Sequence, residues 1–158
     1  MGTYLVVANR TALSVELTEG LKTIKLRDPL AEFTLLVPAT PAMDVAGRQT
    51  DLPERAQATV TEAKKVFERN GLSVVDAHAG DGLPLKAIDD EFQSGRRIYN
   101  GIVVSSLPPD VSNWLGQDLL RRIEHRWGLP VRHIVASIGL APERALRAGP
   151  SEPGPDRR

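Results

Sequence analysis

The sequence predicts an α/β protein built on a parallel β-sheet with helices on both faces. Short apolar runs rich in β-branched residues alternate with longer segments whose apolar residues recur at helical spacing. Most connections between these segments are short, as in a series of strand–helix–strand units. The clearest unit spans residues 98–135, where two apolar strands flank an amphipathic helix. Such a unit has parallel strands and a right-handed crossover, so we expect a doubly wound sheet.

Five strands and four helices are expected. The strands are the apolar runs at residues 4–8, 33–37, 72–77, 99–104 and Val131–Val135. The helices follow from four apolar stripes: Leu13, Leu17, Leu21 and Ile24; Leu52, Ala56, Val60, Ala63 and Phe67; Leu85, Ile88 and Phe92; and Val111, Trp114, Leu115, Leu119, Ile123 and Trp127. We expect the first helix to begin in the polar turn at residues 9–11 and to end at Asp28. Gly71, Gly95 and Gly128 are the expected ends of the other three.

The expected strand order is 3-2-1-4-5, a Rossmann-like arrangement with its topological switch point between the first and fourth strands. Residues 1–137 are expected to form one domain, because 158 residues support a single well-buried core and we see no internal repeat. Residues 138–158 are rich in Pro, Gly, Arg and Glu, and we expect a disordered tail. The aperiodic segment 38–51 is a loop of a length that is usually functional or mobile.

The composition excludes several classes of function. Twenty basic and twenty acidic residues cancel, so the overall charge gives no support for a nucleic-acid or membrane partner. Without cysteine there is no disulfide, thiolate nucleophile or thiolate metal site. No apolar run approaches the roughly 18 residues that span a bilayer. The first apolar run is too short for a signal peptide, and we expect a cytoplasmic protein.

Ligands of an open parallel sheet bind beyond the carboxyl ends of the strands, at the switch point. The candidate ligand-binding residues at this crevice are Asn9, Arg10, Thr11, Val37, His78, Ser105 and Ser106. Each has another interpretation. The two serines are strand-end residues that often satisfy local backbone groups, Asn9 is also a possible helix cap, and Arg10 a possible solvated side chain.

No metal or catalytic residue is assigned. His78, His125 and His133 lie in different elements without metal-ligand spacing. There is no nucleophile elbow, Walker loop or complete dinucleotide fingerprint. No convergent acid–base pair is visible, so the sequence leaves open whether the protein is an enzyme.

Four features of the chain resemble the universal stress protein family. They are the strand order, the Val-Ala-Asn-Arg-Thr segment at residues 7–11, the Val-Val-Ser-Ser segment at 103–106 and the closing Leu-Pro-Val-Arg-His-Ile-Val at 129–135. The resemblance covers about residues 3 to 137 and implies an adenine nucleotide alpha hydrolase-like fold. The family has ATP-binding and non-ATP-binding branches. In the binding branch an aspartate follows the first strand, and a Gly-x2-Gly-x9-Gly-Ser/Thr phosphate loop follows the fourth.

This chain departs from that ATP-binding pattern. Asn9 stands at the aspartate position and Thr11 at a following serine position, while Ser105 and Pro108 replace the first two loop glycines. The final Gly-Ser/Thr falls near residues 116–118, with a length difference of about one residue. Proline at 108 and 109 removes two backbone N–H donors. Aspartates at 110 and 118 either place negative charge where phosphate should lie or cap a helix.

The resemblance therefore favours a non-catalytic binding or regulatory protein of the stress-response type. Domains of the family commonly pair through the edge strand, and we expect a homodimer through Val131–Val135, an apolar edge that benefits from being covered. A further protein partner is left unidentified. The alternative is a nucleotide-binding protein or weak ATPase that uses a modified loop after the fourth strand, with ATP as the one cofactor considered.

Overall fold

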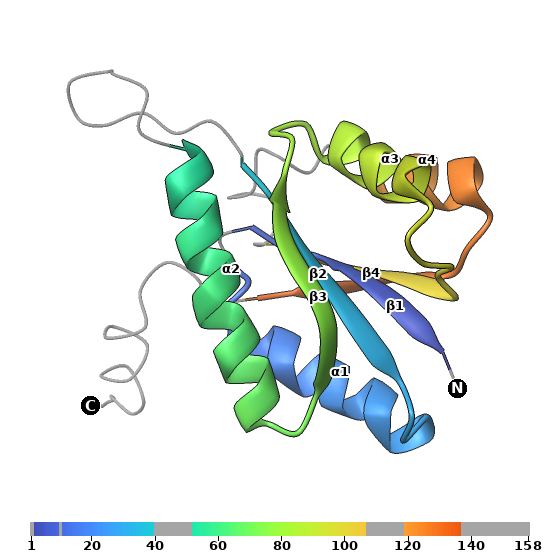
Figure 1. Ribbon diagram of the computed structural model, residues 1–158. Helices are drawn as coiled ribbons and strands as arrows, with labels where there is room; N and C mark the ends of the chain where they lie inside the picture. Colours follow the sequence, from blue (N-terminus) through green and yellow to red (C-terminus); the bar gives the residue numbers. More distant parts are fainter. Residues whose placement is uncertain (1, 10, 40–51, 107–118, 137–158) are drawn as a thin grey trace, which may run out of the picture.

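The computed structural model of the chain describes residues 2–9, 11–39, 52–106 and 119–136. These residues form a five-stranded, all-parallel sheet in the order β3-β2-β1-β4-β5, with helices between the strands (Figure 1). The elements are β1 (Thr3–Val7), α1 (Val15–Arg27), β2 (Glu32–Pro38), α2 (Leu52–Arg69), β3 (Ser73–Gly80), α3 (Pro84–Ser94), β4 (Gly101–Ser106), α4 (Leu119–Trp127) and β5 (Val131–Val135). The expected fold class and strand order are confirmed.

The central strand β1 is buried on both faces. Val6 packs in a core with α1 and α2, whereas Leu5 and Val7 pack in a second core with α3 and α4. Successive side chains of a strand point to opposite faces, so an uninterrupted apolar run is what two covered faces require. Figure 1 shows the resulting layers, with α1 and α2 on one side of the sheet and α3 and α4 on the other.

Three strands extend beyond their expected ends. β2 ends at Pro38, β3 continues to Gly80, which pairs with Pro38, and β4 continues to Ser106, which pairs with Val135 of β5. His78, Ser105 and Ser106 therefore lie within strands and not in the loops that follow them. The apolar runs end earlier than the ladders because polar residues continue the same backbone pairing.

The start of α1 differs from the expectation. The side chain of Ser14 accepts a hydrogen bond from the Leu17 amide at 3.1 Å and caps the helix, which begins at Val15. Leu13 precedes the helix and is 48% exposed, so it does not belong to the apolar stripe. The expected start at residues 9–11 was wrong, because residues 11–13 form a turn in which the amide of Ala12 donates to the carbonyl of Asn9 and the amide of Ser14 donates to the carbonyl of Thr11.

The other expected helix ends agree with the structure. Asp28 ends α1, and the glycines at 71, 95 and 128 follow the ends of α2, α3 and α4 with positive φ angles. On α4, the ring of Trp127 stacks on Phe92 of α3 with 5.2 Å between centroids. Of the loop expected at residues 38–51, Pro38 belongs to β2 and residues 40–51 lie outside the described residues. Residues 107–118, where the fourth helix was expected to begin, and the tail expected at 138–158 also lie outside them.

Candidate functional site

The switch point lies where the carboxyl ends of β1 and β4 run side by side. Val7 of β1 pairs with Val104 of β4 there. The chain leaves the sheet after β1 through Ala8 and Asn9, and β4 ends at Ser106. The end of β2 borders this edge on one side and the end of β5 on the other. The structure therefore brings together most of the polar residues that the sequence placed at the crevice.

Thr11 and Ser105 form a hydrogen bond across the switch point. Their hydroxyl oxygens are 2.6 Å apart, and the two residues are 2% and 0% exposed. One hydroxyl donates and the other accepts, so each satisfies its buried partner. The bond joins the loop after β1 to β4.

Ser106 forms a second polar pair with a strand neighbour. Its Oγ lies 2.6 Å from Nε2 of His133 on β5, and Ser106 is fully buried. Burial lowers the pKa of the His133 ring, because removal from water disfavours the charged imidazolium. The ring is therefore neutral near pH 7, and the tautomer decides whether the Ser106 hydroxyl donates to Nε2 or accepts from Nε2–H.

The Ser106–His133 pair was not predicted from the sequence. The sequence predicted His133 to be a structural residue of the fifth strand. Its partner depends on the register of β4 and β5, in which Ser106 pairs with Val135. In that register His133 lies two residues before Val135, on the same face of β5 as Val135 and diagonal to Ser106. The two-residue alternation along a strand predicts on which face of the sheet a side chain lies. It does not predict the register in which two parallel strands pair.

Asn9 ties the end of β1 to the end of β2. Its side-chain amide donates to the carbonyl of Pro38 at 2.9 Å. The interpretation of Asn9 as the cap of α1 was wrong, because Ser14 occupies that position. Val37 is 1% exposed and packs in the core beside α1 and α2. Arg10 lies outside the described residues, as does the part of the segment compared with the phosphate loop that follows Ser106.

His78 does not join the switch-point residues. It lies on β3, which β2 separates from β1, and its Nε2 is 2.7 Å from Oε1 of Glu91 on α3. Its Nδ1 is also 3.8 Å from the carboxylate of Asp76. The structure therefore places His78 in a separate polar cluster between β3 and α3.

Glu91 is the centre of that cluster, and its side chain is only 1% exposed. Besides His78, it accepts hydrogen bonds from the Tyr99 hydroxyl at 2.5 Å and from Arg96 at 3.3 Å. Burial and the nearby carboxylate of Glu91 raise the pKa of Tyr99, so its hydroxyl stays protonated as a donor. The arrangement satisfies a buried carboxylate and fastens α3 to the sheet.

One sequence signal pointed to Glu91. It lies three residues after Ile88, on the face that α3 turns to the sheet. An acidic residue in a buried stripe needs partners from other elements, and these are visible only once the chain is folded.

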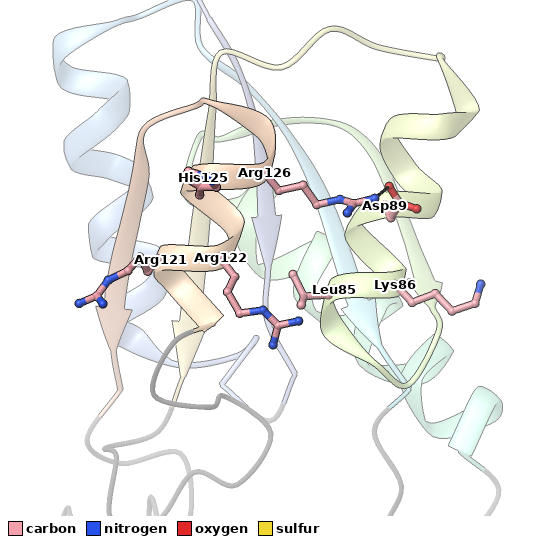
Figure 2. A pocket seen from close by; sticks show the side chains of 7 residues that line it. All are labelled: Leu85, Lys86, Asp89, Arg121, Arg122, His125 and Arg126. Atoms are coloured by element: carbon pink, nitrogen blue, oxygen red, sulfur yellow. Dashed lines mark hydrogen bonds and ion pairs between the residues drawn. The ribbon is translucent and has the colours of Figure 1, made fainter.

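A groove lies between α3 and α4, and the sequence interpretation included none of its residues among the candidate sites (Figure 2). Its lining residues are Leu85, Lys86, Asp89, Arg121, Arg122, His125 and Arg126. We call this the basic groove. Within the residues that the structure describes, no group of three or more His, Asp and Glu side chains is suited to hold a metal ion.

Comparison of the chain with protein-family models and with curated proteins found no match. None of the described helices has the length and apolar character needed to cross a membrane.

The lowered pKa of His133 predicts a specific dependence of stability on pH. The unfolded value is 6.5, and the folded value is lower. The stabilisation is therefore complete above pH 6.5 and is lost as the pH falls below it through the folded pKa. The substitution His133→Gln should make the free energy of unfolding depend less on pH just below pH 6.5. Urea denaturation at a series of pH values measures this dependence.

The matched control is His125→Gln, which removes an exposed histidine on α4. It should keep the pH dependence of the wild-type protein. A His133→Gln protein whose stability follows the wild-type curve through this range would show that His133 does not remain buried and neutral.

Proposed function

We propose that the protein is a non-catalytic binding or regulatory module of the universal-stress-like kind, located in the cytoplasm. The observation that carries the proposal is the pairing of the polar side chains at the switch point. Thr11 bonds to Ser105, Ser106 to His133, and the Asn9 amide to the Pro38 carbonyl. These contacts lie at the carboxyl ends of the strands, the place where this fold class binds ligands.

The same pairing favours binding over catalysis. A nucleophile must be reached by substrate, yet Thr11 and Ser105 are buried and directed at each other. Ser106 does have a histidine within hydrogen-bond distance, but it is fully buried. No contact between His133 and a carboxylate is found among the described residues, so nothing there orients the ring as a triad acid does.

The proposed module acts as a homodimer through β5. In the described sheet β5 pairs with β4 along one edge, and its other edge faces no further strand. Val135, at the end of this strand, is 42% exposed. Open strand edges with apolar side chains favour pairing with another chain, and a second copy supplies an identical edge.

The non-catalytic proposal predicts that ATP, ADP and AMP, with or without magnesium, give no phosphate release. It also predicts that any thermal stabilisation by nucleotide does not depend on Ser106, because Pro108 and Pro109 remove donors and two aspartates add negative charge to the loop after β4. Thermal shift titration and a phosphate-release assay measure the two quantities on the same protein.

Ser106→Ala, with the exposed Ser73→Ala as its control, distinguishes the other outcomes. Saturable stabilisation that Ser106→Ala weakens and Ser73→Ala preserves would identify a nucleotide-binding protein. Magnesium-dependent phosphate release that Ser106→Ala abolishes would contradict the proposal and establish a weak ATPase.

The homodimer is tested by light scattering at high micromolar concentration. The wild-type protein should have the mass of two chains in solution. The Val135→Glu variant should have the mass of one chain, because a buried charge opposes the β5 contact. The control Leu26→Glu changes a residue on α1 that is 83% exposed and should remain dimeric. A monomeric wild-type protein, or equal dissociation of both variants, would contradict pairing through β5.

A further inference from the structure

The basic groove has a volume of about 580 Å³. Four of its seven lining residues are lysine or arginine and one is acidic, whereas basic and acidic residues balance over the whole chain. Volumes of roughly 300 to 1,000 Å³ are typical of small-molecule sites. The groove is therefore large enough for a small ligand and concentrates positive charge that the composition did not predict.

Part of this charge has no partner among the residues that the structure describes. The acid, Asp89, is bonded to Arg126 at 2.9 Å, and this contact lowers the pKa of Asp89. Lys86 pairs with Asp90 at 3.1 Å. Arg121 and Arg122 are exposed, and neither has an ion pair or hydrogen bond within the described part of the chain.

The arrangement of charges on α4 is unfavourable in the absence of an anion. Arg122 and Arg126 are four residues apart, so they lie on one face of the helix and repel each other. The first described turn of α4 contains no acidic residue and includes Arg121 and Arg122, so no carboxylate on that turn offsets their charge.

We propose that the basic groove binds a small ligand that carries phosphate groups, at a site separate from the switch-point crevice. Figure 2 shows Arg122 extending from α4 toward α3, beside Leu85, while Arg126 reaches across to Asp89. The planar guanidinium of Arg122 matches a phosphate group with two parallel N–H donors. Leu85 supplies an apolar contact for the rest of the ligand.

Inorganic diphosphate is the probe for this site, added to the full chain by calorimetric titration with ionic strength held constant by sodium chloride. Wild-type protein should bind it saturably. Arg122→Gln should bind about tenfold more weakly, because it loses a charge-assisted hydrogen bond. Arg122→Lys should lie between the two, since it keeps the charge and loses the planar fork.

The matched control is Arg69→Gln, an exposed arginine on α2 across the sheet, which should bind diphosphate as the wild-type protein does. Unchanged thermal unfolding of ligand-free Arg122→Gln confirms an intact fold, as expected for a side chain that bonds to none of the described residues. Three results would overturn the inference: no saturable binding at millimolar diphosphate, no greater loss in Arg122→Gln than in Arg69→Gln, or a loss in Ser106→Ala alone. The last result would place the diphosphate at the switch point.

Discussion

The hydrogen bond between Thr11 and Ser105 joins the loop after β1 to β4 at the switch point, where the proposed ligand site lies. After β1 the chain turns to the face covered by α1, and after β4 it continues toward α4 on the opposite face. The bond holds the loop after β1 against β4. If it were absent, two buried hydroxyls would be left without partners, at a cost of about 1–3 kcal/mol each.

The other polar contacts extend this arrangement along the same edge of the sheet. Ser106 and His133 join β4 to β5, and Asn9 joins the end of β1 to the end of β2. Four strand ends are thereby connected by side chains in addition to the backbone ladders. Such a preorganised edge favours recognition of a ligand by fixed groups, since little ordering is required when the ligand binds. The basic groove lies apart from it, between two helices on one face of the sheet.

The fold was predictable because it depends on short-range patterns. Uninterrupted apolar runs predicted strands buried on both faces, and their alternation with amphipathic segments predicted the order β3-β2-β1-β4-β5. Strand ends were less predictable, since His78 and Ser106 continue the ladders although they are polar. The helix start at Ser14 was missed because Leu13 fits the helical period yet lies outside the helix.

The site was predictable in its location and less so in its contacts. Parallel topology placed Asn9, Thr11 and Ser105 at one edge, and the structure brings them there. The partners of His78 and Ser106 come from other elements, so they depend on packing and register that no single segment contains. The basic groove was missed for the same reason, because α3 and α4 are brought together only by the folded sheet.

A double-mutant cycle on Thr11→Val and Ser105→Ala tests the central claim most directly. The unfolding free energies of the wild-type protein, both single variants and the double variant are measured by urea denaturation. If the bond fixes the switch point, the two substitutions should be coupled by about 1 kcal/mol, with the double variant less destabilised than the sum of the single variants. Additive effects within experimental error would show that the two hydroxyls act independently and would contradict the account.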